Sequence, residues 1–160
     1  MHNFKSLAVL RHGEAESSRL KNGDFNRNLS EEGRSQVKRL SKLLKKNDFE
    51  IDLILSSSAN RTKETTELIS QETNVGSIKF EDGIYEAEQD ELLKMINGLE
   101  ENFDSVLLIG HNPGLSDLLS SITGGNYINL QPGMMAVMEI QVEEWSMVGE
   151  ETGILKEVIQ

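Results

Sequence analysis

Short, mainly apolar runs alternate with longer amphipathic stretches along most of this 160-residue chain. Runs of this length suit buried strands, and the stretches between them are long enough for helices. Strands that alternate with helices predict an α/β fold whose central sheet is largely parallel. We expect strands at residues 7–10, 51–55, 78–80 and 106–109.

The amphipathic stretches have the spacing of helices, with apolar residues three or four positions apart. Ser30 precedes the first stretch and is a favourable N-cap, and Glu31 and Glu32 follow it where a helix N-terminus favours acidic residues. Pro113 precedes the last stretch, where its fixed backbone angle suits a first helical turn. We expect helices at residues 30–46, 61–71, 92–99 and 115–122.

Two further strand-like segments, residues 134–140 and 154–159, follow the last helix with no helix between them. Strands connected in this way pair antiparallel at the edge of a mixed sheet. We therefore expect a single domain over residues 1–160. Its fold class is α/β, a three-layer α/β/α sandwich with a mostly parallel central sheet and an antiparallel edge strand.

The charge and the cysteine content exclude several function classes. The 16 Lys and Arg residues against 27 Asp and Glu residues give a formal net charge of −11, which argues against nucleic acid or an anionic membrane as a partner. The chain has no cysteine, so a disulfide scaffold, a thiolate metal site and a cysteine nucleophile are excluded. The sequence shows neither a signal peptide nor a membrane-spanning apolar run. We expect a cytoplasmic protein.

Basic side chains follow three of the expected strands. Arg11 and His12 follow the first strand, Arg61 lies shortly beyond the second, and His111 follows the fourth. In open α/β sheets, ligands bind beyond the carboxyl ends of the strands, so we expect these side chains to share one site. Such a site is a basic pocket in an acidic protein, and the planar guanidinium group of arginine suits phosphate oxygens. A phosphoryl group is its natural occupant.

Four segments resemble the motifs of the histidine phosphatase superfamily, which includes the phosphoglycerate mutases, and they occur in the family's order. RHGEA begins at Arg11 and GHNPG ends at Gly114, with RNLSEEG at 27–33 and SSANRTKET at 57–65 between them. The motifs cover about residues 5–120. The short chain and the HNPG form are most similar to the SixA-type phosphohistidine phosphatases. The resemblance implies one histidine-phosphatase-like domain with phosphatase activity.

By this resemblance His12 is the nucleophile, which forms a covalent phosphohistidine intermediate that water then hydrolyses. Its ring must be neutral, with one nitrogen free and the other donating to a backbone carbonyl, and nearby arginines help by lowering its pKa. Arg11 and Arg61 bind the phosphoryl oxygens and stabilise the charge that develops on them. His111 is a further donor, expected in its protonated form. Taken singly, each side chain also fits a structural role, such as a buried histidine or a solvated arginine.

Two further assignments depend on the same resemblance. Arg27 matches another phosphate-contacting arginine of the family. Glu86 is the candidate general acid, because the family commonly uses a carboxylate to protonate the leaving group. Other carboxylates between residues 81 and 90 compete with Glu86 for this assignment. A phosphohistidine substrate also depends less on an acid, because its P–N bond is labile.

No metal and no cofactor is expected at this site. His12, Glu14, Glu16 and His111 could supply ligands, but they lack metal-binding spacing and the flanking arginines repel a cation. We expect the substrate to be phosphohistidine on a partner protein, because the chain has no room for a large lid. A phosphomonoesterase acting on small molecules through the same pocket is the alternative within enzymes. A non-catalytic phosphate-binding or interaction module is the alternative outside them.

Overall fold

The computed structural model describes residues 4–17 and 23–160. Within these ranges six strands form one sheet in the order β3-β2-β4-β1-β5-β6. The strands β1 to β4 are parallel to one another, whereas β5 pairs antiparallel with β1 and β6 pairs antiparallel with β5. The strands are β1 (Lys5–Arg11), β2 (Glu50–Ser57), β3 (Asn74–Glu81), β4 (Ser105–Gly110), β5 (Met135–Ile140) and β6 (Gly153–Ile159).

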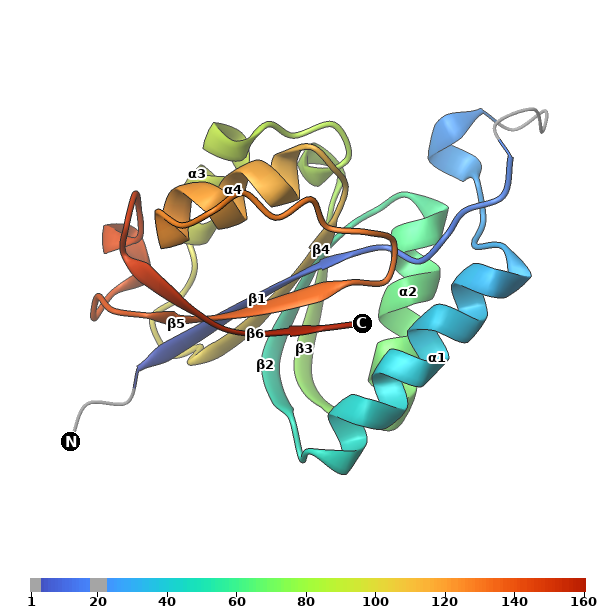
Figure 1. The fold of residues 1–160 in the computed structure, drawn as a ribbon, viewed down its shortest axis with the longest axis horizontal. Helices are drawn as coiled ribbons and strands as arrows, with labels where there is room; N and C mark the ends of the chain where they lie inside the picture. Colours follow the sequence, from blue (N-terminus) through green and yellow to red (C-terminus); the bar gives the residue numbers. More distant parts are fainter. Residues whose placement is uncertain (1–3, 18–22) are drawn as a thin grey trace.

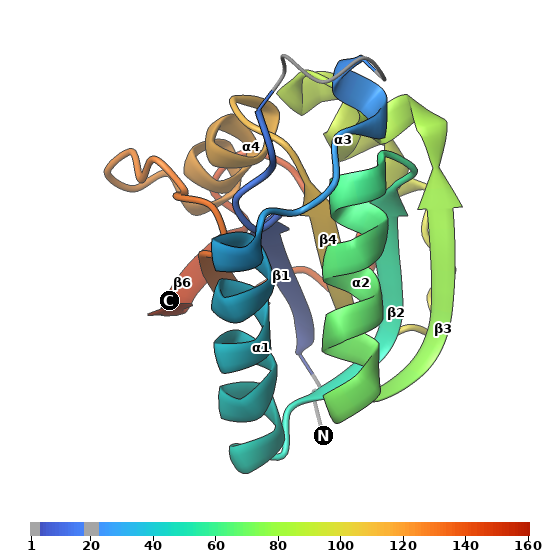
Figure 2. The same ribbon diagram turned by 90° about the vertical axis from the view of Figure 1, so that its right-hand side faces the viewer.

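Two helices cover each face of this sheet (Figures 1 and 2). The helices α1 and α2 lie on one face, and α3 and α4 lie on the other. In the described part of the chain, three short 3-10 helices lie in the connections, and no helix is long and apolar enough to cross a membrane. The helices are α1 (Glu31–Lys46), α2 (Asn60–Glu72), α3 (Gln89–Asn97), α4 (Gly114–Thr123), η1 (Asp24–Asn26), η2 (Asp82–Ile84) and η3 (Trp145–Met147).

The expected fold class is confirmed, and every expected strand and helix is present. The antiparallel part of the sheet is a pair of strands. The edge strand β6 runs in the same direction as β1, because two antiparallel pairings in succession restore the direction. Pro113 immediately precedes α4 instead of entering its first turn.

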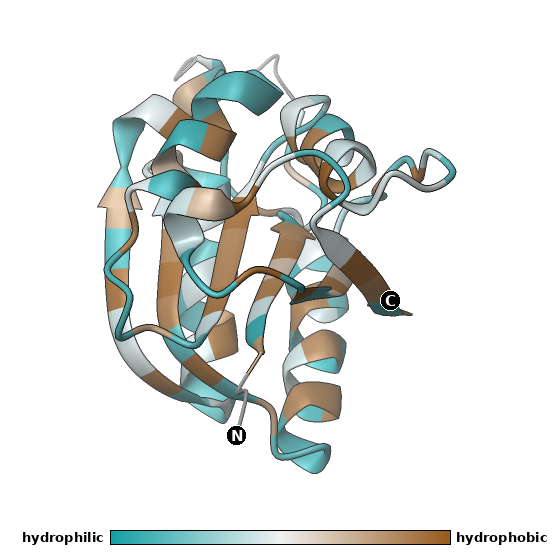
Figure 3. Cartoon of the chain, turned by 90° about the vertical axis from the view of Figure 1, so that its left-hand side faces the viewer, coloured by the Kyte–Doolittle hydropathy of each residue, from teal (hydrophilic) through white to brown (hydrophobic). Residues whose placement is uncertain are grey.

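The central strands bury side chains on both faces of the sheet. Along β1, Leu7 and Val9 belong to the core between the sheet and α3 and α4, whereas Ala8 and Leu10 belong to the core beneath α1 and α2. Figure 3 shows hydrophobic residues concentrated along these strands. A strand covered on both faces needs apolar residues at every position, which explains why β1 contains a continuous apolar run.

Close backbone contacts position the loop that follows β1. The hydroxyl oxygen of Ser30 caps α1 by accepting from the N–H of Gly33 at 3.0 Å, and the N–H of Ser30 donates to the carbonyl of Glu14 at 2.9 Å. A Cβ atom on Gly33 would collide with the carbonyl oxygen of Glu14, and one on Gly13 would lie 2.7 Å from the carbonyl oxygen of Gly33. The two glycines therefore let α1 begin directly against the loop that carries His12.

Candidate active site

Three side chains from neighbouring strand ends meet in one pocket. His12 follows β1, His111 follows β4, and Arg61 lies in the first turn of α2, just after β2. Because β4 lies between β1 and β2, the carboxyl ends of the three strands are adjacent. The Nε of Arg61 donates to Nε2 of His12 at 3.3 Å, and its Nη2 donates to Nδ1 of His111 at 3.4 Å. One guanidinium group therefore links both imidazole rings.

The ring of His12 has the tautomer that a nucleophile needs. Its Nδ1 lies 2.6 Å from the carbonyl oxygen of Gly13, so Nδ1 carries the proton and donates it. Nε2 keeps its lone pair, which accepts from Arg61. Burial lowers the pKa of His12 to about 4; the hydrogen bond to Gly13 opposes this shift, and the charges of three nearby arginines add to it. The ring is therefore neutral at physiological pH.

His111 is neutral in the protein by itself, whereas the expectation of a protonated ring concerns His111 as a donor to a phosphoryl group and stays a prediction. Burial, followed by the His12 ring and the charge of Arg61, lowers the pKa of His111 to about 3. Because its Nδ1 accepts from Arg61, its proton is on Nε2, which donates to Oγ of Ser57 at 2.8 Å. A phosphoryl dianion beside the ring would raise this pKa, because an opposite charge favours the imidazolium form.

Arg11 and Arg27 complete the basic lining of the pocket. The Nη1 of Arg11 donates to the carbonyl oxygen of Leu130 at 2.9 Å, and the Nε of Arg27 donates to that of Glu16 at 2.7 Å. These backbone acceptors hold the two guanidinium groups at the pocket wall. The pocket has a volume of about 310 Å³ and is lined by Arg11, His12, Glu14, Ala15, Arg27, Arg61, His111, Asn112 and Pro132.

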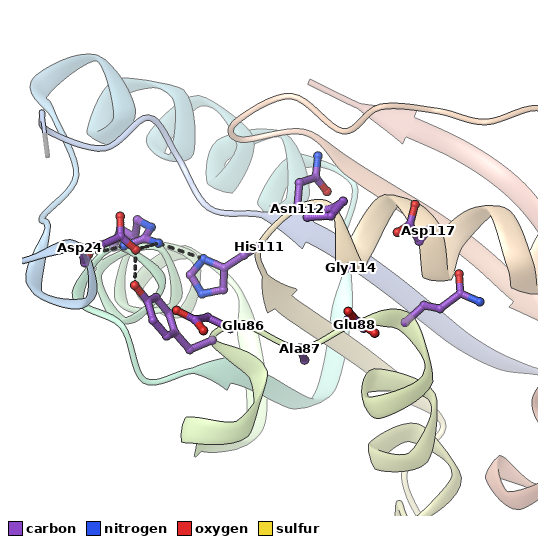
Figure 4. A pocket seen from close by; sticks show the side chains of 12 residues that line it. Asp24, Glu86, Ala87, Glu88, His111, Asn112, Gly114 and Asp117 are labelled. Atoms are coloured by element: carbon purple, nitrogen blue, oxygen red, sulfur yellow. Dashed lines mark hydrogen bonds and ion pairs between the residues drawn. The ribbon is translucent and has the colours of Figure 1, made fainter.

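Asp24, which the sequence did not single out, joins two of these arginines. Its Oδ1 accepts from Nη1 of Arg27 at 2.7 Å, and its Oδ2 accepts from Nη2 of Arg61 at 3.1 Å. The hydroxyl group of Tyr85 donates to the same Oδ2, and Figure 4 shows Asp24 and His111 toward the same end of the cavity. The hydrogen bond from Tyr85, together with the two arginines, holds the pKa of Asp24 well below its usual range. The carboxyl group is therefore ionised.

A second cavity of about 510 Å³ shares Arg61, His111 and Asn112 with the first. Glu86 lines this second cavity and is exposed to solvent (Figure 4). The structure therefore brings Glu86 to the cavity that adjoins the pocket of His12, not into that pocket itself. Glu88 and Asp117 line the same cavity.

Tyr85 and Ser57 are two more site residues that sequence reasoning missed. The ring of Tyr85 meets His111 edge-on, with ring centroids 5.4 Å apart, and the guanidinium group of Arg61 lies 5.6 Å from the Tyr85 ring. Tyr85 directly precedes the candidate Glu86, so its segment could have suggested it. Ser57 begins the third motif, but its contact with His111 spans 54 positions, which local spacing does not reveal.

The arrangement suits attack of an uncharged nitrogen on a phosphoryl group. A neutral imidazole supplies the lone pair, and three arginines supply positive charge for the oxygens. Among residues 4–17 and 23–160, no three His, Asp or Glu side chains are placed to hold a metal ion.

A family model described as the histidine phosphatase superfamily (branch 1) matches residues 7–107, which is more than half of the chain. The chain belongs to the histidine phosphatase superfamily. The resemblance to this superfamily is thereby confirmed, whereas no curated protein matches the chain in sequence.

Solved structures of this superfamily share the fold. A structure from Agrobacterium tumefaciens that carries the name of the phosphohistidine phosphatase SixA has a TM-score of 0.85 and 25% identity, covering 98% of this chain and 97% of its own. The protein histidine phosphatase SixA complexed with tungstate has a TM-score of 0.82 and 20% identity, covering 96% of each chain. A mycobacterial glucosyl-3-phosphoglycerate phosphatase has a TM-score of 0.69 and 14% identity, covering 95% of this chain and 97% of its own.

The low pKa of His12 leads to a prediction for the pH dependence of activity, with His12 as the nucleophile. An unperturbed histidine becomes protonated below pH ~6.5, whereas the lone pair of His12 stays available down to about pH 4. Because kcat/KM reports ionisations of the free enzyme, its acid limb is expected near pH 4, with a tenfold loss for each further pH unit. The measurement is a pH profile from 3.5 to 8, corrected for ionisation of the substrate and checked for folding by circular dichroism. A limb near pH 6.5 would show that the pKa of His12 is not lowered.

Proposed function

We propose that this phosphatase forms a covalent phosphohistidine intermediate on His12. The observation that carries the proposal is the tautomer of His12, whose unprotonated Nε2 faces Arg61 in a basic pocket. Membership of the superfamily supports phosphatase activity. Three arginines line this pocket in a protein whose formal net charge is −11, so the positive charge of the pocket runs against the charge of the whole protein.

In the first step, Nε2 of His12 attacks phosphorus, an N–P bond forms, and the bond to the leaving group breaks. The positive charge that develops on the ring is stabilised by the hydrogen bond from Nδ1 to the carbonyl of Gly13. Arg11, Arg27 and Arg61 neutralise the phosphoryl oxygens, which is the work that a metal ion does in many other phosphoryl-transfer sites. We therefore propose that the reaction needs no metal ion.

Glu86 is the proposed proton donor for the leaving group, and in the second step it takes a proton from the attacking water. Water attacks the phosphorus of the intermediate, the N–P bond breaks, and inorganic phosphate leaves. His12 then returns to its neutral form. The position of Glu86 in the cavity that adjoins the pocket of His12 supports this role, because a proton donor must lie within reach of the leaving group.

We further propose that the substrate is phosphohistidine on a partner protein. The second cavity adjoins His111 and Arg61 and is large enough for a side chain. Its carboxylates (Asp24, Glu86, Glu88 and Asp117) disfavour small phosphorylated acids, which would bring further negative charge. Likeness to the structures named SixA agrees with this substrate class.

A substrate panel tests this function. The purified protein is expected to hydrolyse a phosphohistidine peptide with a kcat/KM at least about tenfold above those for a phosphoserine peptide, p-nitrophenyl phosphate and 3-phosphoglycerate. EDTA is expected to leave all rates unchanged. Efficient turnover of a small phosphoester alone would show a small-molecule phosphomonoesterase. Phosphate binding without any turnover would show a non-catalytic module, and activity that EDTA removes and a divalent cation restores would overturn metal independence.

A further inference from the structure

The carboxylate of Asp24 binds arginine nitrogens that the phosphoryl oxygens would use. It accepts from Nη2 of Arg61 at 3.1 Å and from Nη1 of Arg27 at 2.7 Å. The backbone carbonyl of Asp24 also accepts from Nη1 of Arg61 at 2.7 Å. Arg61 therefore gives its Nε to His12 and both of its Nη groups to other acceptors within the protein. A phosphoryl oxygen that approaches the Nη edge of Arg61 meets a carboxylate already there.

A hydrogen bond from Tyr85 and the packing of aromatic rings hold this carboxylate in place. The hydroxyl group of Tyr85 donates to Oδ2 of Asp24. Phe25, the next residue in η1, meets the Tyr85 ring edge-on with centroids 4.9 Å apart, and Tyr85 in turn contacts His111. Asp24 is thus held both by the hydrogen bond to its side chain and by the packing of its neighbour Phe25. Its side chain is nevertheless 48% exposed, whereas that of Arg61 is 8% exposed, so the carboxylate can turn into solvent while Arg61 stays.

The difference in charge between Asp24 and a phosphoryl group favours replacement of the carboxylate by the phosphoryl group at the arginines. Asp24 carries one negative charge, whereas a phosphoryl group carries up to two near neutral pH. Three arginines with an internal carboxylate hold a dianion less tightly than three arginines alone, because the carboxylate repels it and occupies its donors. Asp24 is ionised at every pH at which the protein is expected to act, so it is a fixed competitor and not a proton donor.

We propose that Asp24 is an internal counter-anion that competes with phosphate for Arg61 and Arg27 and so promotes release of the product. The substrate phosphoryl group displaces the carboxylate from the arginines, and the carboxylate returns as inorganic phosphate leaves. This inference rests on the proposed function, because it concerns the affinity of the same pocket. A carboxylate that served only to position Arg61 would have the opposite effect, since its removal would weaken phosphate binding.

Asp24→Asn separates the two roles, because asparagine keeps the volume and an acceptor oxygen but removes the charge. Inorganic phosphate is titrated calorimetrically into the wild type and the variant at pH 7.5 and low salt. The Kd for phosphate is expected to fall about fivefold in Asp24→Asn, and the inhibition constant of phosphate in turnover is expected to fall equally. An unchanged or higher Kd overturns the proposal.

Two further variants control the measurement. Asp90→Asn removes one negative charge from the exposed first turn of α3, where the residue lines neither cavity, and is expected to change the Kd less than twofold. Tyr85→Phe removes the hydroxyl group that holds Asp24 but keeps the charge, and is expected to tighten phosphate binding less than Asp24→Asn does. An equal gain in Asp90→Asn, or weaker binding in both Asp24→Asn and Tyr85→Phe, counts against the proposal. If the wild type binds phosphate but hydrolyses nothing, the proposed function fails while the test of Asp24 still stands.

Discussion

Replacing His12 with asparagine is expected to lower kcat by at least ~10³-fold, because the variant has no ring nitrogen that can accept the phosphoryl group. The side-chain amide of the introduced asparagine can still donate to the carbonyl of Gly13, so the local hydrogen bond is retained. In the wild type, rapid quenching with a ³²P-labelled substrate is expected to trap label on the protein that is stable in base and lost in acid. His12→Asn is expected to trap none.

His111→Asn is the matched control for this experiment. The ring centroid of His111 lies 5.2 Å from that of His12. The variant therefore removes a histidine from the same pocket but leaves the proposed nucleophile. Its label is expected to form more slowly and to remain on His12. Thermal unfolding of both variants checks that they fold. Equal hydrolysis by the wild type and His12→Asn would show that the covalent mechanism is wrong.

Replacing Arg61 with alanine is expected to lower kcat/KM by roughly 10²- to 10³-fold, because Arg61 contacts both histidines and provides charge for the phosphoryl oxygens. Arg61→Lys is expected to recover only a small part of this loss. A lysine keeps the charge, but its single nitrogen cannot reach His12, His111 and Asp24 in the way that a planar guanidinium group does. Steady-state kinetics with the phosphohistidine peptide measure both variants.

Arg39→Ala is the control for the loss of one positive charge. Its side chain is 65% exposed on α1 and lies 3.6 Å from Glu32, so its removal is expected to change kcat/KM less than twofold. Full recovery of activity in Arg61→Lys would show that Arg61 contributes only charge. Calorimetric titration with phosphate separates lost binding from lost catalysis in Arg61→Ala.

Much of the fold was predictable because the central strands are covered on both faces. Continuous apolar runs such as residues 106–109 arise only where a strand has helices on each side, and the helical stripes identified those helices. The order of the strands was not predictable in the same way. Periodicity is a local property, whereas the placement of β4 between β1 and β2 depends on how distant segments pack.

The residues of the candidate site also differ in whether local sequence features predicted them. Arg11, His12 and His111 are at or next to strand ends and Arg61 lies shortly beyond one, so a rule about strand ends was enough to group them. Arg27 and Glu86 came only from the resemblance to the family, and the structure places them in the two adjoining cavities. The neutral form of His111 in the protein by itself was not predictable, because the pKa depends on burial and on neighbours that spacing along the chain does not show.

The sequence by itself determined the local elements, the apolar faces that they bury and the histidines and arginines at the strand ends. Only the tertiary structure decided which nitrogen of His12 is free, because that depends on contacts with Gly13 and Arg61. It also decided that Asp24 lies on the arginines, since Asp24 is 37 positions from Arg61 and 61 positions from Tyr85. Hydrogen bonds and Coulomb interactions act over a few ångströms in space, and separation along the chain does not measure that distance.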